Sequence, residues 1–556
     1  MEANKPTNYG AMGTLITVFF FWGFIAAGNG VFIPFCKNYF KLDQFQSQLV
    51  DFAFYGAYYI GALILFVFSA LKNKDIVSSW GYKKSIVYGL LFSLLGAIAM
   101  IVTVKTGSTE NGFSFFLLSF FILALGFSLQ QTAANPFAMT LGDPATGSNR
   151  ITLGGAINSF GTTIGPIVVA VALFGTTSVN DSLLQSLSLD KVTILYACVG
   201  LLFLAAASLF WFSKKVPDGI SDSSMESAQK AMMAMIAITV LLFVCFIPIF
   251  NSYRDVSENI SADDKHHLEL FRMYWLVGAL VVVIGGLLWA NKTAQSSPIG
   301  WGALKYPQLV LGMIAIFVYV GVEVTIQSNL GELLKRPEYG SMQAADIAPY
   351  ISMYWGSLMI GRWAGSIPVF KLEENTKRVL GFIVPIIAFA VVILCNIIAQ
   401  KNMEPLYFYI VCIIALIIAF YMTKNKPMTT LMVFSASGVI AMVIGLMTTG
   451  VVSIYSFLCG GLFCSIMWPC IFSLSLAGLG KFETQGAAFL IMMILGGAIL
   501  PPLQGKLADF PSIGIHNSYW LAVACFGYLV FFAWKVKQIL QKQGIDYDES
   551  VSKASH

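Results

Sequence analysis

The stretch Tyr319-Val-Gly-Val-Glu323-Val-Thr-Ile-Gln327 places a carboxylate inside an apolar run that extends from Pro307 to Leu330. At helical spacing Tyr319, Glu323 and Gln327 share one face, while Val, Ile and Phe cover the remaining surface. An acid at membrane depth costs at least about 2.5 kcal/mol even on lenient insertion scales. The stripe is therefore expected to line a water-filled cavity or to meet a partner, and a functional site is favoured over a structural polar contact.

The composition is that of an integral membrane protein. Hydrophobic residues make up 57% of the 556 positions and charged residues only 11%, which places the chain outside the range of water-soluble domains. The net charge of +5 is small and no basic, aromatic-interleaved patch is present, so no nucleic-acid partner is expected. The nine cysteines lie almost entirely in apolar runs, at spacings that suit neither a disulfide framework nor a metal site.

The apolar runs predict about 16 membrane-spanning helices, at roughly 20 residues for each span. The first run, Ala11 to Phe35, is interpreted as a retained span rather than a signal peptide. Lysines gather in alternate loops after the second, sixth and tenth spans, and again after Trp534. The positive-inside rule therefore predicts a multi-pass protein of the bacterial cytoplasmic (inner) membrane, surrounded by lipid, with both termini in the cytoplasm.

Two halves of the chain repeat one another. Aromatic-Gly-x-x-x-Ile-Gly occurs at Tyr55 to Gly61 and again at Trp355 to Gly361, about 300 residues later. Gly161 and Pro166 match Gly496 and Pro501 at an offset about 35 residues larger, a difference that one extra helical hairpin explains. The sequence leaves open whether that hairpin is 378 to 422 or 405 to 449. Parallel six-helix repeats are the arrangement of major facilitator transporters, which hold substrate between the halves.

The expected organisation follows from this repeat. The fold class is all-α and integral to the membrane: a major facilitator fold of two six-helix repeats with two inserted helical hairpins. The predicted segments are an N-terminal half (1–213), a central linker with one inserted hairpin (214–306), a C-terminal half with a second inserted hairpin between about 378 and 449 (307–540), and a flexible cytoplasmic tail (541–556).

Neutral amides dominate the polar positions within the spans. Gln131 and Asn135 share a face beside Pro136, Asn158 lies in the next span, and the repeat pairs Asn29 with Gln327. Amides without charges suit a neutral hydroxylated ligand better than an ion, so we expect these five to bind sugar hydroxyls. The alternative is interhelical hydrogen bonding, worth about 0.6 kcal/mol for each bond.

Aromatic and charged residues complete the candidate site. Five aromatic residues are candidates to stack on the C–H faces of a sugar: Trp22, Tyr58, Tyr354, Trp355 and Trp468. Most aromatics in so aromatic a chain must nevertheless be packing or interface anchors. Arg362, near the cytoplasmic end of its span, is a candidate gate or latch. Its alternative role is to extend toward the interface as a snorkelling side chain.

Several of these motifs together resemble one family. Gln131-Thr-Ala-Ala-Asn-Pro-Phe, Ile157-Asn-Ser-Phe-Gly161, Tyr319-Val-Gly-Val-Glu323 and Trp468-Pro469 are similar to the fucose, galactose and glucose permeases of the major facilitator superfamily. The loop from Asp75 to Lys84 resembles the loop signature of that superfamily, which makes Asp75 a candidate gating residue. The resemblance implies a twelve-helix core and sugar uptake coupled to a cation, usually a proton.

The chain departs from that family at the acids. Members generally carry an acid directly after the Asn of the first helix, where this chain has Gly30, and the fucose branch has Glu at the position of Gln131. Glu323 is therefore the expected coupling site. Asp51, about five residues into the second span, is a candidate to replace the missing acid, unless it caps its helix at headgroup level.

The sequence therefore predicts a proton-coupled importer of a neutral hexose of the glucose, galactose or fucose class that works by alternating access. Four alternatives stay open: an uncoupled carrier, a sodium-coupled carrier, a drug or lipid exporter, and a sugar sensor that does not transport. No enzyme motif, nucleotide-binding loop, cofactor or metal site is expected. We expect a monomer whose partners are a sugar, a proton or other cation, and lipid.

Overall fold

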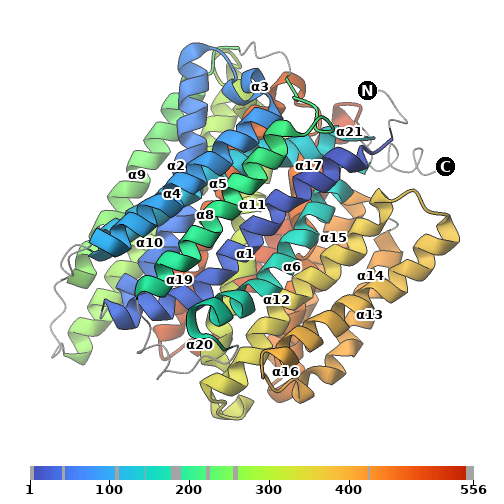
Figure 1. Cartoon of the computed structure of the whole chain (residues 1–556). Helices are drawn as coiled ribbons and strands as arrows, with labels where there is room; N and C mark the ends of the chain where they lie inside the picture. The colour runs from blue at the N-terminus through green and yellow to red at the C-terminus, as the bar shows by residue number, and fades with distance from the viewer. Residues whose placement is uncertain are drawn as a thin grey trace.

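The computed structural model describes residues 6–40, 44–106, 112–143, 146–176, 189–220, 226–254, 261–423 and 426–545. These residues form an all-helical bundle (Figure 1). The helices of the first part of the chain are α1 (Tyr9–Tyr39), α2 (Gln44–Lys72), α3 (Ile76–Trp80), α4 (Tyr82–Thr106), α5 (Gly112–Thr140), α6 (Gly147–Phe174), α8 (Leu189–Phe212), α9 (Gln229–Arg254) and α10 (Ala262–Ser296). Those of the second part are α11 (Pro307–Leu334), α12 (Ala344–Ser366), α13 (Glu374–Ile398), α14 (Ile410–Thr423), α15 (Pro427–Met447), α16 (Gly450–Cys464), α17 (Met467–Leu476), α18 (Glu483–Met492), α19 (Gly496–Asp509), α20 (Gly514–Ser518) and α21 (Trp520–Lys542).

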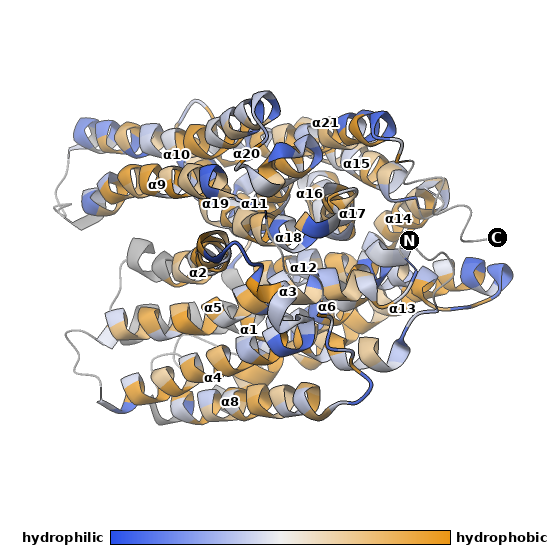
Figure 2. Ribbon diagram, turned by 90° about the horizontal axis from the view of Figure 1, so that it is seen from above, coloured by the Kyte–Doolittle hydropathy of each residue, from blue (hydrophilic) through white to orange (hydrophobic). Residues whose placement is uncertain are grey.

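The chain is a multi-pass membrane protein. Within the described residues, 14 helical segments are long and apolar enough to cross a bilayer. Two further long helices, α1 and α12, do not meet that criterion over their described residues. The described apolar part of α1 covers only Tyr9–Ile25, and α12 carries charged and polar residues. Figure 2 shows hydrophobic residues along the middles of the helices and hydrophilic residues at their ends. This distribution matches a bilayer core between two aqueous faces.

The two halves pack their helices in the same way. In the first half (α1 to α8), α1 packs on α6, α2 on α5, and α4 on both α5 and α8. In the second half (α11 to α21), α11 packs on α19, α12 on α16, and α15 on both α16 and α21. The hairpin of α9 with α10 and the hairpin of α13 with α14 have no counterpart in this pattern. They lie at opposite edges of the molecule in Figure 1.

Equivalent glycines lie at close helix crossings in the two halves. A Cβ at Gly161 of α6 would lie 2.6 Å from the carbonyl oxygen of Phe20, and one at Gly496 would overlap the carbonyl of Phe317. These are the positions that the sequence repeat matches between the halves. Small residues at such crossings allow helices to approach closely, which is the main source of helix association in lipid.

We expect Gly161→Ala to destabilise the protein strongly, because the added methyl group must push α6 away from the backbone of α1. The matched change Gly13→Ala places a methyl group where no atom lies within 4 Å, and should be neutral or slightly stabilising. Thermal unfolding of both purified variants in detergent measures the difference. Equal midpoints for the two variants would contradict the close crossing.

Candidate functional site

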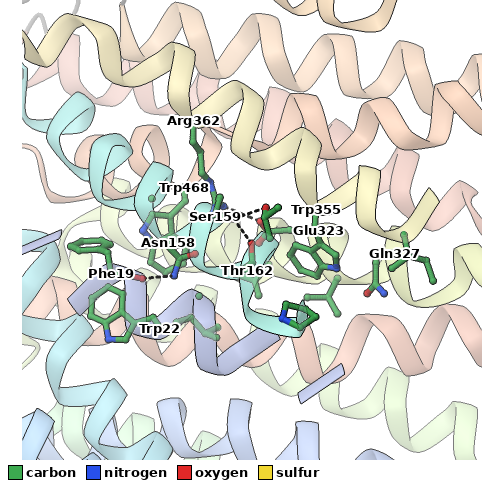
Figure 3. A pocket seen from close by; sticks show the side chains of 18 of the residues that line it. Phe19, Trp22, Asn158, Ser159, Thr162, Glu323, Gln327, Trp355, Arg362 and Trp468 are labelled. Atoms are coloured by element: carbon green, nitrogen blue, oxygen red, sulfur yellow. Dashed lines mark hydrogen bonds and ion pairs between the residues drawn. The ribbon is translucent and has the colours of Figure 1, made fainter. Parts of the chain in front are cut away.

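A cavity of about 600 Å³ lies between the two halves, lined by residues from both. In Figure 3, Phe19, Trp22 and Asn158 of the first half lie on one side, and Glu323, Trp355 and Gln327 of the second half lie on the other. A volume of this size suits a small molecule such as a monosaccharide. Its lining mixes aromatic side chains with amides and hydroxyls, as expected for a polar but uncharged ligand.

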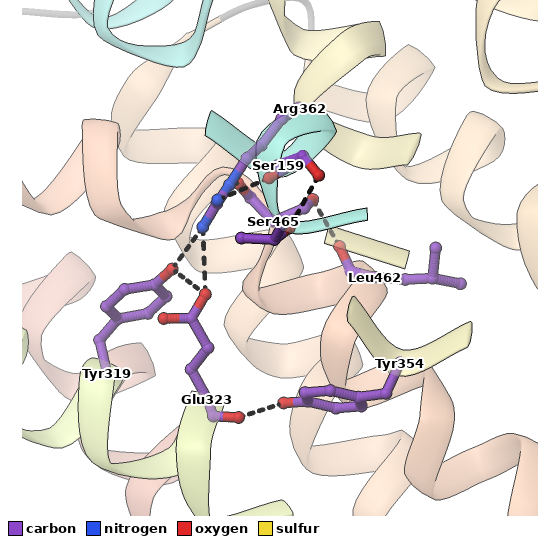
Figure 4. A network of polar contacts seen from close by, with 8 residues as sticks. Ser159, Tyr319, Glu323, Tyr354, Arg362, Leu462 and Ser465 are labelled. Carbon is purple, nitrogen blue, oxygen red and sulfur yellow. Dashed lines mark hydrogen bonds and ion pairs between the residues drawn. The ribbon is translucent and has the colours of Figure 1, made fainter. Parts of the chain in front are cut away.

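A buried ion pair occupies the centre of this site (Figure 4). The Arg362 guanidinium donates to the carboxylate of Glu323 at 3.0 Å, and both side chains are only about an eighth exposed. The Tyr319 hydroxyl donates to the same carboxylate oxygen at 3.0 Å. Arg362 also donates to the Ser465 carbonyl at 3.0 Å and to the hydroxyl of Ser159 at 2.7 Å. Because Ser159 belongs to α6 of the first half, this cluster joins the two halves.

The geometry corrects one alternative for Arg362. A snorkelling arginine extends its guanidinium toward the interface, whereas this one turns into the cavity to meet Glu323. Burying both charges costs several kcal/mol for each ion, and their mutual attraction together with the surrounding hydrogen bonds offsets that cost. The pairing of α11 with α12 through these residues could not be read from the sequence of either helix alone.

Four of the five candidate amides can be located, and all four line the cavity. Gln131 donates to the Tyr58 hydroxyl at 3.3 Å, and Asn135 donates to the Gln131 carbonyl at 3.0 Å. Asn158 donates to the Phe19 carbonyl at 3.1 Å, so it also serves the α1–α6 crossing. Gln327 makes no side-chain hydrogen bond to any described residue, which leaves its amide free for a ligand. Asn29, the fifth, lies in α1 outside the residues whose side chains are described.

Among the candidate aromatics, Tyr354 does not line the cavity, whereas four do: Trp22, Tyr58, Trp355 and Trp468. Tyr354 is completely buried, and its hydroxyl donates to the backbone carbonyl of Glu323 at 2.7 Å. The expectation that Tyr354 stacks on a ligand therefore does not hold in this conformation. Its neighbour Trp355 is the aromatic residue of α12 that faces the cavity (Figure 3).

Of the two remaining candidates, only the side chain of Asp75 is described, and it lies away from the central cluster. Asp75 caps α3, where its carboxylate accepts from the backbone amide of Ser78 at 2.9 Å. Burial raises the pKa of Asp75, and hydrogen bonds from Ser78 and Val77 oppose that shift. Asp51 lies in α2 but its side chain falls outside the described residues. Sequence reasoning missed Ser159, which only its contact with Arg362 reveals. It also missed the cavity residues Asn396, in α13, and Lys401, in the loop that follows.

Contacts between the halves gather on one face of the molecule. We call the side where α1 begins and α21 ends the terminal face (Figure 1). Asn149 donates to the Gly365 carbonyl at 3.1 Å, and the hydroxyls of Ser78 and Thr484 are 3.0 Å apart. Tyr9 donates to the Val369 carbonyl at 3.0 Å. These contacts join helix ends of the first half to helix ends of the second on the terminal face.

Known proteins provide an independent comparison. The chain is 29% identical over 532 residues to a glucose/galactose transporter of Brucella abortus, which covers 96% of this chain and 95% of that protein. It is 23% identical over 525 residues to the L-fucose-proton symporter of Escherichia coli, covering 93% of this chain and 91% of that protein. No family model matches the chain.

Solved structures agree on the fold. A crystal structure of the Escherichia coli fucose:proton symporter superposes with a TM-score of 0.59 at 20% identity, covering 95% of this chain and 99% of that one. A major facilitator superfamily transporter in its outward conformation gives 0.59 at 19% identity, covering 94% and 98%. The architecture is therefore that of the major facilitator superfamily. Over nearly its whole length, the chain is similar to fucose, galactose and glucose permeases.

Proposed function

We propose that this protein is a secondary transporter that imports a neutral hexose together with a proton by alternating access. The observation that carries the proposal is the cavity between the halves, which contains amide and aromatic side chains, with the free amide of Gln327 among them, beside the Glu323–Arg362 pair. Relatives over nearly the whole chain are named as a glucose/galactose transporter and as a fucose-proton symporter. Both names point to a sugar as the substrate class.

The proposed topology has 16 spans. Fourteen segments qualify by length and composition, and we add α1 and α12 because both line the cavity at the interface of the halves. Residues 1–213 and 307–540 then form the two halves. The α9–α10 hairpin, between 214 and 306, is one insert. Helix α15 packs in the second half as α4 packs in the first, which favours the α13–α14 hairpin as the other insert. An even number of spans keeps both termini on one side.

The orientation follows from the lysines of the terminal face. Lys72, Lys74, Lys83 and Lys84 flank α3, and Lys214 and Lys215 follow α8. By the positive-inside rule, these loops lie on the cytoplasmic side of a bacterial inner membrane. Because the contacts between the halves gather on the terminal face, we infer an outward-facing state that is ready to receive a sugar from outside the cell.

Coupling is proposed to arise from competition for Glu323. The carboxylate can be neutralised by Arg362 or by a proton, but protonation removes most of its attraction for the guanidinium. The guanidinium donors that this releases can then bind sugar hydroxyls in the same cavity. Proton and sugar therefore favour each other's binding, and this reciprocal coupling is what a symporter requires.

The expected substrate test is uptake of labelled glucose, galactose, fucose and N-acetylglucosamine by proteoliposomes that contain the purified protein. We expect at least one hexose to be transported, and Gln327→Leu to raise its KM about tenfold or more, because a buried hydrogen bond to the ligand is lost. The matched variant Gln343→Leu changes an amide near the start of α12 that does not line the cavity, and should leave KM unchanged. Uptake of none of the four sugars would contradict the proposal.

A further inference from the structure

The α13–α14 hairpin, which lies outside the repeated packing pattern, supplies part of the cavity wall. Asn396, at the end of α13, and Lys401, in the loop that follows, both line the cavity. The hairpin reaches this position because α13 packs on α12, where Val392 fills the space beside Gly356. The insert therefore adds two polar groups to a site that the two halves otherwise build.

The backbone holds Lys401 in place. Helix α13 ends in a tight turn in which Gln400 adopts a left-handed conformation with φ of +60°. The amide of Lys401 then donates to the Asn396 carbonyl at 3.0 Å, and the amide of Gln400 donates to the Ile397 carbonyl at 2.9 Å. This is the hydrogen-bonding pattern of a helix C-terminal cap, which fixes the direction in which the chain leaves the helix.

The ammonium group of Lys401 lacks an anionic partner within the part of the chain that the structure describes. No carboxylate there lies within ion-pair distance of it, although the side chain is partly buried. Lys335 and Lys377, by contrast, each pair with a glutamate three residues away. The other charges that line the cavity, Glu323 and Arg362, neutralise each other. Among the described residues that line the cavity, Lys401 therefore carries the one uncompensated charge.

Burial of an unpaired cation is unfavourable, and here it lowers the pKa of Lys401. An anion bound beside this group would recover that loss, because hydrogen bonds between charged partners are roughly twice as strong as neutral ones. The side-chain amide of Asn396 donates to the Val392 carbonyl at 2.8 Å. Together with the amides deeper in the cavity, these groups suit a ligand with several hydroxyls and one acidic group.

We propose that Lys401 is a specificity-determining residue that binds the carboxylate of an acidic sugar, so that the carrier accepts hexuronates as well as neutral hexoses. The inference rests on the proposed function, since it adds a substrate class to the same cavity. The ring hydroxyls of a hexuronate are those of the corresponding hexose and meet the same amides. Only the oxidised carbon differs, and its charge is what Lys401 recognises.

The test is competition against uptake of the labelled neutral hexose in proteoliposomes, with unlabelled galacturonate, glucuronate, galactose, glucose and acetate as competitors. For at least one uronate, we expect half-inhibition of wild-type uptake at a concentration about tenfold below that of the neutral hexose with the same ring hydroxyls. The ratio of these two concentrations is the quantity compared between variants. Lys401→Gln should reduce this ratio to about one, and Lys401→Arg should retain most of it. Lys335→Gln removes the same charge from an exposed lysine at the C-terminal end of α11. This variant should leave the ratio unchanged.

The outcomes separate the two proposals. Absence of neutral hexose uptake by wild type contradicts the proposed function. Normal hexose uptake with no inhibition by either uronate, or with the same ratio in Lys401→Gln as in wild type, overturns the role of Lys401 alone. Inhibition by acetate at the uronate concentration would also overturn it, because the anion would then bind without the sugar ring.

Discussion

Replacing Glu323 with glutamine is expected to abolish accumulation of hexose against its gradient while exchange of labelled for unlabelled hexose continues. Glutamine has nearly the same shape and can still accept the hydrogen bond from Tyr319, but it cannot bind and release a proton. The coupling step is lost and the movement of the halves is retained. Accumulation driven by an imposed pH gradient and counterflow without one, measured on the same proteoliposomes, distinguish the two activities.

Glu332→Gln is the matched control. Glu332 lies on the same helix, α11, but it is exposed and pairs with Lys335 outside the cavity. This variant should accumulate hexose as wild type does. If Glu323→Gln also accumulates hexose to the wild-type level, Glu323 is not the coupling group.

Replacing Arg362 with glutamine is expected to reduce uptake about 100-fold and to lower stability, because the carboxylate of Glu323 is left buried without its partner. Breaking a buried pair by removal of one member costs about 3–5 kcal/mol. The double variant Glu323→Gln with Arg362→Gln should recover much of that stability, since no buried charge remains, but should not recover accumulation. Thermal unfolding of the single and double variants, combined as a double-mutant cycle, measures the interaction directly.

The control for this series is Arg336→Gln, which removes an arginine whose nearest carboxylate, that of Glu338, is 3.7 Å away at the surface. Exposed pairs contribute about 0–1 kcal/mol, so this variant should unfold close to wild type. Equal stability of Arg362→Gln and Arg336→Gln would show that the central pair contributes little to the fold.

The features that the sequence predicted well are those with a strong periodic or steric signal. The repeat was visible because Gly161 and Gly496 occupy equivalent helix crossings, where any larger side chain would meet backbone. Glu323 stood out because a carboxylate in an apolar span is costly and needs a partner or water. Both signals come from a property of the residue itself: the absence of a side chain at the glycines and the charge of the glutamate.

The features that the sequence did not predict depend on how helices are rotated and paired. Tyr354 and Trp355 are adjacent and so point about 100° apart on α12, and only packing against α11 decides that Trp355 faces the cavity. The sequence makes Arg362 a candidate gate or a snorkelling side chain, and its pairing with Glu323 depends on how α11 and α12 meet. Lys401 follows a span, where a lysine usually indicates topology, and its place at the cavity depends on the packing of an inserted hairpin.

The most direct test of proton-coupled hexose transport through Glu323 is the pH change that hexose addition causes in a lightly buffered suspension of proteoliposomes. For the wild-type protein we predict alkalinisation of the medium when the transported hexose is added, because each sugar enters with a proton, and none for Glu323→Gln. Hexose uptake by wild type without any pH change, or the same alkalinisation by Glu323→Gln, would contradict the account.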